Sequence, residues 1–418
     1  MTLKEFIKKY ETEVIDEEVP VDYRVTQEAK DQPKTPIYFP KFPNGPLLVN
    51  LWASRSRLAD FFDIEKGQII EKLAEAVDEP IKTESIEQVG FKDHVEKNVD
   101  LTKLPIPKYY PEDGGRYITS GIVVTEHDGV RNLSYHRLML RDDNTFTIRI
   151  CPRHLKKMYD LAVEEKGYLD IAVVIGVNPA VLLGASTSID YETDELEVAN
   201  SLLKSTTGEK VKMAEIENGI SVPADSEYVL QGKITAEKDD EGPFVDITGT
   251  YDKIRQQPVV EIDKIYKRKD AIFHALLPGG NEHFLLMGLP RESVLKRELS
   301  KLTEIKDVRL TEGSCVWLHG IVSIKDENAD VEEIIERSFE AHSSMKKVTV
   351  VNDDIDIFND KEVEWAIATR FQPDEDIYVY ENKKGSSLDP SAPDLTAKWG
   401  VDATRPWEGE EFKRAELE

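Results

Sequence analysis

The segment EGPFVD places two carboxylates, Glu241 and Asp246, on either side of a Gly-Pro turn. Taken alone, such a segment is typical of a tight turn that carries two solvated acids. The upstream residues that could act with it are an arginine able to clamp an anion and three residues of types that bind hard metal ions, namely Arg137, Asn132, His154 and Glu195. A guanidinium presents a planar fork that can hold a carboxylate by two parallel hydrogen bonds. Together these residue types would suffice for decarboxylation on a phosphate-bearing cofactor.

The middle of the chain must position these side chains, and its pattern predicts a β-rich region. Residues 117–151 alternate between apolar and polar types around two turn signals, Asp128-Gly129 and the run at 142–144, which predicts a meander of strands. Further strands are predicted over residues 171–177, 229–235, 244–251, 259–266 and 271–277, and a helix over residues 194–204.

One consequence of this pattern concerns Asn132 and Arg137, which are five residues apart. On one regular strand two such side chains would point to opposite faces, because side chains alternate along a strand. We therefore expect either that Asn132 lies in the turn before the strand or that a bulge lies between the two residues.

The flanking regions mix helices and strands. In the N-terminal region we predict a helix over 2–15, a strand over 47–51 and a helix over 65–76, and the Pro/Gly-rich stretch from Pro105 marks a boundary. After residue 283 the pattern predicts helices over 291–302, 331–344 and 361–369, strands over 316–324, 348–351 and 377–380, and an irregular tail from Lys383. The acidic run 353–360 is interpreted as a loop at a strand end. The fold class is therefore α+β/α/β and multidomain: an N-terminal αβ segment (1–105), a central β-rich domain (106–285) and a C-terminal α/β layer domain (286–418).

The composition excludes several classes of protein. The chain of 418 residues carries a net charge of −27, which argues against nucleic acid or an anionic membrane as a general partner. Two cysteines cannot form a disulfide framework, and no apolar run reaches the roughly 20 residues that span a bilayer. Because the N-terminus also lacks an apolar signal core, we expect a cytoplasmic protein. Walker A, GxGxxG, GxSxG and HExxH motifs are absent from the sequence.

An ordered set of segments resembles the UbiD-type decarboxylases that use prenylated FMN. The matching segments run in the order of that family along most of the chain: 50–62, 132–137, His154, 194–199, 222–232, 241–252, 268–280, 363–379 and 399–404. Each segment is weak alone, and the ordered set is specific. The resemblance implies a flavin-binding split β-barrel in the middle of the chain and a C-terminal domain for oligomerisation. It further implies a homo-oligomer built on dimers, a flavin prenyltransferase that supplies the cofactor, and a carboxy-lyase activity.

The family's catalytic pattern implies roles for three residues of this chain. Arg137 would hold the substrate carboxylate, Glu241 would orient Arg137, and Asp246 would donate the proton that replaces carbon dioxide. A dry pocket and a nearby carboxylate would raise the pKa of Asp246 toward that role.

The resemblance also implies how the cofactor is held. Its phosphate would be bound through a divalent metal ion, manganese or magnesium, on Asn132, His154 and Glu195, with Glu197 as an alternative to Glu195 and potassium as a further candidate ion. The residues expected to contact the cofactor are Asn132, Tyr135, His136, Arg137, Arg149, Ile150, Cys151 and His154. A nucleophilic role for Cys151 is the alternative reading of that residue, but no paired His/Asp motif accompanies it.

Some positions depart from the family pattern and leave the substrate open. Gln231, Val245 and Leu155 stand where the family often has other residues, and the latter two could reshape the pocket. The chain is also short for the family, which favours trans-anhydromevalonate 5-phosphate as the substrate over an aromatic acid of the hydroxybenzoate type. Two other readings remain: a conventional FMN-binding oxidoreductase, and a flavin-binding assembly subunit without chemistry.

Overall fold

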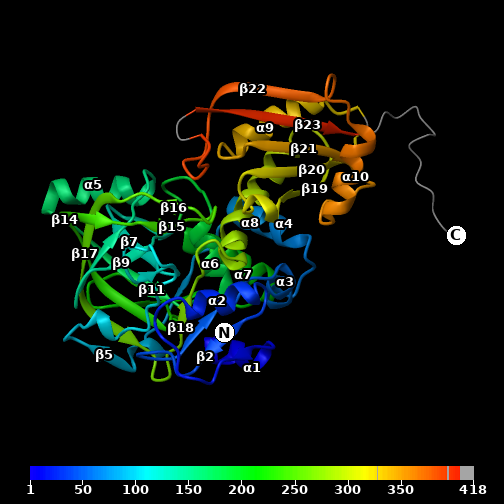
Figure 1. The fold of residues 1–418 in the computed structure, drawn as a ribbon. Helices are drawn as coiled ribbons and strands as arrows, with labels where there is room; N and C mark the ends of the chain where they lie inside the picture. Colours follow the sequence, from blue (N-terminus) through cyan, green and yellow to red (C-terminus); the bar gives the residue numbers. More distant parts are fainter. Residues whose placement is uncertain (327, 393–394, 405–418) are drawn as a thin grey trace. The chain divides into compact units, whose positions relative to one another are not determined.

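A computed structural model of the protein describes residues 1–326, 328–392 and 395–404 (Figure 1). The chain forms two compact units, Met1–Leu286 and Met287–Glu418. The first unit joins the predicted N-terminal segment to the predicted central domain, because β3 (Leu47–Val49) pairs in parallel with β18 (Phe273–Ala275). None of the described helices is both long enough and apolar enough to cross a membrane.

The N-terminal part of the first unit is built on a small sheet with the strand order β1-β2-β3-β18. Its other elements are α1 (Leu3–Lys9), β1 (Glu13–Val14), α2 (Arg24–Asp31), β2 (Ile37–Phe39), α3 (Arg55–Phe62) and α4 (Gln68–Asp78). The helix predicted over residues 2–15 is thus wrong in its second half. Helix α1 starts at a capping box of Thr2 and Glu5 and ends at Lys9, and the chain then turns into β1.

A larger sheet forms the core of this unit, with the order β6-β9-β10-β17-β14-β11-β7-β8 and β5 paired to β17. Its strands are β5 (His94–Glu96), β6 (Tyr117–Ile118), β7 (Ile122–His127), β8 (Val130–Tyr135), β9 (Leu138–Leu140), β10 (Thr145–Ile148), β11 (Tyr168–Ile175), β14 (Tyr228–Glu241) and β17 (Arg255–Lys267). The β14–β17 ladder shifts register at Gln231/Gly232. Only glycine fits there, because a Cβ on Gly232 would lie 2.0 Å from the backbone oxygen of Glu261.

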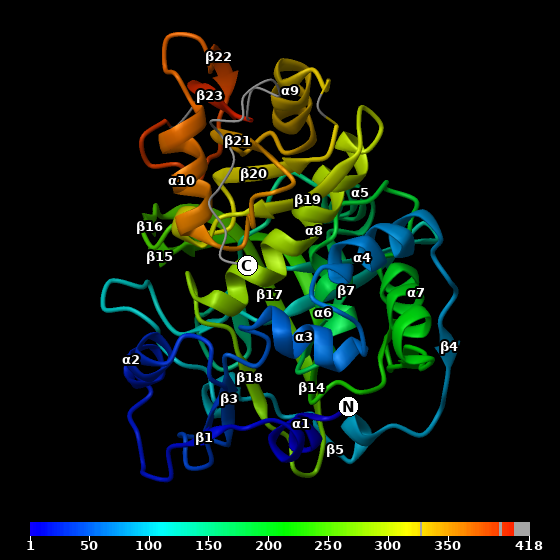
Figure 2. The same ribbon diagram turned by 90° about the vertical axis from the view of Figure 1, so that its right-hand side faces the viewer.

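Helices pack against this sheet, and two of them, α5 (His154–Lys166) and α7 (Glu195–Thr207), begin at residues of the predicted site. A further helix is α6 (Pro179–Ser186). Helix α7 packs against both α4 and α6 (Figure 2). The sequence pattern predicts α7 but indicates neither α5 nor α6. The remaining short elements are β4 (Glu84–Ser85), β12 (Lys212–Glu215), β13 (Ser221–Pro223), β15 (Phe244–Val245), β16 (Tyr251–Asp252) and the 3₁₀ turns Gly90–Lys92 and Leu101–Lys103.

The strand predicted over residues 244–251 is also wrong. Strand β15 covers two residues and pairs with β16 across a loop, whose turn is closed by a hydrogen bond from the N–H of Gly249 to the carbonyl of Asp246. Gly249 has φ +75°, which allows the chain to turn back at this point. The alternation of residue types across 244–251 therefore belongs to a tight hairpin and not to one continuous strand. The loop exposes Asp246 beside β16.

The second unit contains a five-stranded sheet of order β19-β20-β21-β23-β22. Its elements are β19 (Ile305–Leu310), the turn Glu312–Ser314, β20 (His319–Ile324), α9 (Val331–Ala341), β21 (Lys347–Asn352), α10 (Asp360–Arg370), β22 (Ile377–Lys384) and β23 (Leu395–Ala403). A core of apolar side chains, among them Ile321, Val351 and Val401, lies between sheet and helices. The mixed α+β multidomain architecture predicted from the sequence is confirmed.

Two predictions for this region need correction. Helix α8 (Asn281–Leu299) starts ten residues before the predicted Arg291, and Pro290 lies inside it. Proline removes one backbone donor from a helix without ending every helix that contains it. The tail predicted to be irregular contains the end of β22 and all of β23, which pairs in parallel with β21. The loop predicted over 353–360 follows the end of β21, but its last residue, Asp360, is the first residue of α10.

Candidate active site

Arg137 lies where the chain leaves one part of the large sheet for another. Strand β8 ends at Tyr135 and β9 begins at Leu138, and the two strands have different neighbours in the sheet. Asn132 lies inside β8, so the expected interruption between Asn132 and Arg137 is present. The interruption is neither a turn before the strand nor a bulge. It is the short connection between β8 and β9, which is held by a hydrogen bond from the N–H of Arg149 to the carbonyl of Arg137.

The guanidinium of Arg137 meets three carboxylates. Glu241 accepts from Nε at 2.8 Å and from Nη2 at 2.8 Å, so this pair is bidentate. Asp246 accepts from Nη1 at 3.2 Å, and Asp252 accepts from Nη2 at 3.0 Å. The three residues that EGPFVD and the upstream arginine suggested therefore converge at one point, together with a carboxylate that the sequence reasoning did not identify.

Burial makes these charges strongly interdependent. Burial by itself lowers the pKa of Arg137, but the contacts with Glu241, Asp246 and Asp252 outweigh it and hold that pKa above its usual value. Arg255 forms a second ion pair with Asp252. Three carboxylates thus share two guanidinium groups, so one negative charge is left uncompensated. Protonation of one acid would relieve this imbalance.

Asp246 is the most exposed of the three acids. Its side chain is 22% exposed, whereas that of Glu241 is fully buried. Asp246 also makes the longest of the contacts with Arg137. Its other oxygen accepts from the N–H of Ile247 at 2.7 Å.

The EGPF turn is held against a glycine-rich loop. The N–H of Gly114 donates to the carbonyl of Pro243 at 2.8 Å, and a Cβ on Gly114 would lie 2.2 Å from the oxygen of Gly242. Asp113 accepts from the N–H of Val245, and burial raises the pKa of this acid to about 6. The position of Glu241 and Asp246 thus depends on a close backbone contact that leaves no room for a side chain.

His283, in the first turn of α8, is a further residue that the sequence reasoning missed. The N–H of Gly279 donates to its Nδ1 at 3.1 Å, which puts the ring proton on Nε2. Burial lowers the pKa of His283, and the nearby charge of Asp246 opposes that shift. A neutral imidazole therefore stands next to the candidate proton donor. A signal for it was present in the sequence, as the His that follows the Pro-Gly-Gly turn at 278–280.

The predicted metal ligands also lie together. Glu195 accepts from the amide of Asn132 and from the backbone N–H of Leu133, both at 2.9 Å, and Nδ1 of His154 lies 4.0 Å from Glu195. Glu195 is buried in this cluster, whereas the half-buried Glu197 takes no part in these contacts. Glu195 is therefore the better candidate of the two.

This cluster fits a divalent cation and a phosphate. Burial raises the pKa of Glu195 to about 8, and a bound cation would favour the ionised form of this carboxylate. His154 and Glu195 are the first residues of α5 and α7, and helix N-termini favour anions. The N-cap residue of α5, Arg153, makes no side-chain cap, which leaves the first N–H groups of that helix available.

The other residues predicted to contact a cofactor differ in their surroundings. His136 is buried between Ser134 and the carbonyl of Arg149, and burial lowers its pKa to about 4, so it is neutral. The hydroxyl of Tyr135 is buried without a hydrogen-bond partner among the described residues. Ile150 is buried, whereas Cys151 is exposed and its thiol is free.

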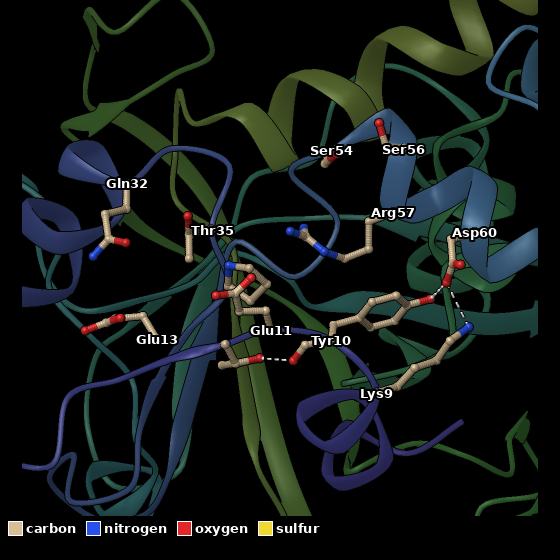
Figure 3. A pocket seen from close by; sticks show the side chains of 12 residues that line it. Lys9, Tyr10, Glu11, Glu13, Gln32, Thr35, Ser54, Ser56, Arg57 and Asp60 are labelled. Carbon is tan, nitrogen blue, oxygen red and sulfur yellow. Dashed lines mark hydrogen bonds and ion pairs between the residues drawn. The ribbon is translucent and has the colours of Figure 1, made fainter.

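A polar hollow of about 690 Å³ lies elsewhere in the first unit, between the end of α1 and the start of α3 (Figure 3). Three of its charged side chains have partners: Lys9 and the hydroxyl of Tyr10 both contact Asp60, and Arg57 donates to the backbone carbonyls of Leu51 and Lys34. Of the described residues that line this hollow, none belongs to the predicted site.

The fold and this site define the chain as a member of the UbiD family. Residues 83–281 match the 3-octaprenyl-4-hydroxybenzoate carboxy-lyase Rift-related domain, and residues 284–403 match the C-terminal domain of the same carboxy-lyases. The chain belongs to the UbiD family and is an enzyme of this decarboxylase class, as the sequence resemblance predicted.

The chain is similar along its whole length to curated decarboxylases and to solved UbiD-class structures. The chain is 44% identical to the anhydromevalonate phosphate decarboxylase of Methanocaldococcus jannaschii and 40% identical to that of Methanosarcina mazei, over 99% of each chain. The UbiD-class enzyme HmfF from Pelotomaculum thermopropionicum, solved in complex with FMN, has 32% identity and a TM-score of 0.96, covering 100% of this chain and 97% of that one. An evolved dimeric form of HmfF, solved with prFMN, has a TM-score of 0.92 at 31% identity, with the same coverage.

Proposed function

We propose that this enzyme is a prenylated-FMN-dependent decarboxylase whose substrate is anhydromevalonate phosphate. The observation that carries the proposal is the guanidinium of Arg137, which Glu241 holds along one edge while Asp246 contacts its remaining nitrogen. This arrangement fixes a cation beside an acid that can exchange a proton. It supports a reaction in which a carboxylate is bound and a proton then replaces carbon dioxide.

The residues divide the work as follows. Glu241 holds Arg137 in one orientation, so the substrate carboxylate meets a preorganised donor at Nη1. Asp246 is protonated at that stage, which removes the repulsion between two carboxylates at the same nitrogen. When bound, the modified flavin supplies the electron sink for the electron pair that carbon dioxide leaves behind. Asp246 then delivers its proton to that carbon and regains a proton from solvent through its exposed face.

The flavin phosphate would be held through Mn²⁺ or Mg²⁺ on Asn132, His154 and Glu195. The buried carboxyl of Glu195 and the N-terminus of α5, which has no side-chain cap, support this role. The same ion would restore the charge of Glu195. A potassium ion beside it, and cofactor contacts from Tyr135, His136, Arg149, Ile150 and Cys151, belong to the same proposal.

The choice of substrate rests on the relatives. Five proteins named anhydromevalonate phosphate decarboxylase, at 36–44% identity, match 87–99% of this chain. Solved relatives that act on aromatic acids, such as the vanillic acid decarboxylase of Sedimentibacter hydroxybenzoicus at 26% identity, are more distant. An aromatic acid is therefore the second candidate. We also propose a homo-oligomer and a flavin prenyltransferase as the supplier of the cofactor.

The test is co-expression with a flavin prenyltransferase, followed by measurement of carbon dioxide release. We expect release from anhydromevalonate phosphate and little from hydroxybenzoate-type acids, with no dependence on NAD(P)H. Protein expressed without the prenyltransferase is the matched control and should be inactive. Release from aromatic acids alone would overturn the substrate, and NAD(P)H oxidation without carbon dioxide would overturn the reaction.

A further inference from the structure

Three side chains form a cluster that the proposed reaction does not use. His127 ends β7, Asp128 opens the hairpin turn to β8, and Glu165 lies in the last turn of α5. One ligand atom from each lies within 4.8 Å of the other two. Nε2 of His127 is 3.8 Å from a carboxylate oxygen of Asp128 and 3.6 Å from one of Glu165.

The imidazole of His127 is aimed into this cluster without a hydrogen bond. Its side chain is 9% exposed, and Nε2 is buried with no hydrogen-bond partner among the described residues. A buried polar atom without a partner loses its hydration without a compensating hydrogen bond. The two carboxylates lie beyond hydrogen-bond distance from Nε2 but within 4 Å of it. This geometry suits an ion between the three groups better than direct contact.

The charges of the cluster also call for a cation. Glu165 stands at the C-terminal end of α5, where the helix macrodipole is negative and a carboxylate is disfavoured. The neighbouring Lys166 does not neutralise it, because its ammonium pairs with Asp170. Asp128 has φ +51°, so an Asp-Gly turn explains its presence. The turn does not explain why the carboxylate of Glu165 lies close to that of Asp128.

We infer that His127, Asp128 and Glu165 bind a divalent transition-metal ion, with zinc as the best match and water in the remaining positions. One imidazole and two carboxylates are ligands that zinc accepts. Two ligands of a tetrahedral zinc ion, each about 2.1 Å from it, are about 3.4 Å apart, close to the separations in this cluster. The ion would tie the β7–β8 hairpin to α5.

This site is distinct from the cluster of Asn132, His154 and Glu195, because the two share no residue. The test uses the full-length protein stripped of metal and dialysed against Zn²⁺. Wild type is compared with Glu165→Gln and Asp128→Asn, which keep the shape of the side chains and remove one ligand charge. Glu164→Gln is the matched control, because Glu164 is an exposed carboxylate on the same helix turn outside the cluster.

We expect wild type and Glu164→Gln to retain one more zinc ion per chain than either cluster variant. Zinc should raise the unfolding temperature of wild type more than that of Glu165→Gln. Crystals soaked in Zn²⁺ should show an anomalous peak about 2 Å from Nε2 of His127. Equal zinc retention by all four proteins, or no peak at His127, would overturn the inference. The difference in retention does not depend on the cofactor site, which all four proteins keep intact.

Discussion

Glu241 binds Arg137 through both oxygens of its carboxylate, each 2.8 Å from a guanidinium nitrogen. This pair leaves Nη1 to Asp246 alone. In the proposed mechanism this arrangement would separate two tasks: Glu241 would fix the guanidinium, and Asp246 would remain available to exchange a proton.

Replacement of Arg137 by lysine tests the bidentate geometry. A lysine keeps the charge but cannot present two parallel donors to Glu241. We expect kcat/KM to fall by on the order of 10²–10³, the loss typical of removing one preorganised donor. The control is Arg141→Lys, because the side chain of Arg141 pairs with Glu237 and Asp239 and contacts none of the three acids around Arg137 among the described residues. Equal activity of the two variants would show that charge alone suffices at position 137.

His283 should act through Asp246. Asn can replace Nδ1 as the acceptor for the N–H of Gly279 but cannot reach the position of Nε2, whereas Gln can place an amide there. We expect His283→Asn to lower kcat by about tenfold to a hundredfold with a smaller change in KM, and His283→Gln to recover part of the loss. The pH profile of kcat should shift in the Asn variant. An unchanged kcat and profile would remove His283 from the account.

The close approach of Gly114 to the EGPF turn predicts an effect on activity at a residue that carries no chemistry. A methyl group on Gly114 would collide with the oxygen of Gly242. We expect Gly114→Ala to displace the turn that carries Glu241 and to lower kcat strongly. Gly67→Ala is the control, because nothing lies within 4 Å of a Cβ built at Gly67. If both variants kept full activity, the turn would not depend on this contact.

Glu227 should make the stability of the first unit depend on pH. Its carboxylate accepts from the N–H groups of Leu3 and Ile272, but burial dominates and raises its pKa from 4.5 to about 7. A raised pKa means that the folded state favours the protonated acid. The contribution is therefore complete below about pH 4.5 and is lost as pH rises through about 7.

The size of this effect is at most on the order of 3 kcal/mol. Urea unfolding followed across that pH range measures it directly. Glu227→Gln has no charge to lose and should show a flatter dependence than wild type. An equal slope in the two proteins would assign the pH dependence to other groups.

The sequence indicated the chemistry of the candidate site but did not identify all of the residues that form it. Glu241 and Asp246 could be found because they share one short motif with a Gly-Pro turn. Asp252 lies in the same matched segment, but nothing in its local pattern says that β15 and β16 fold it back onto Arg137. Such a contact arises from tertiary structure, which a single sequence does not specify locally.

The candidate metal ligands were also not fully determined by the sequence, for the same reason. Glu195 and Glu197 are two residues apart, and sequence alone could not choose between them. The structure favours Glu195. Asp194 caps α7, so Glu195 is the first residue of that helix, and its carboxylate accepts a hydrogen bond from the amide of Asn132. His283 was missed for a related reason: helix α8 continues through Pro290, so the turn that carries His283 was not recognised as part of a helix.

The most direct test of the central claim is single-turnover analysis of Asp246→Asn with the loaded enzyme. Asparagine preserves the shape of the side chain and a partner for Arg137 but cannot give up a proton to carbon. The account predicts that the variant folds, binds flavin, and releases at most about one equivalent of carbon dioxide per site without free product. Sustained turnover at the wild-type rate would contradict it, because Asp246 would then not be the proton donor.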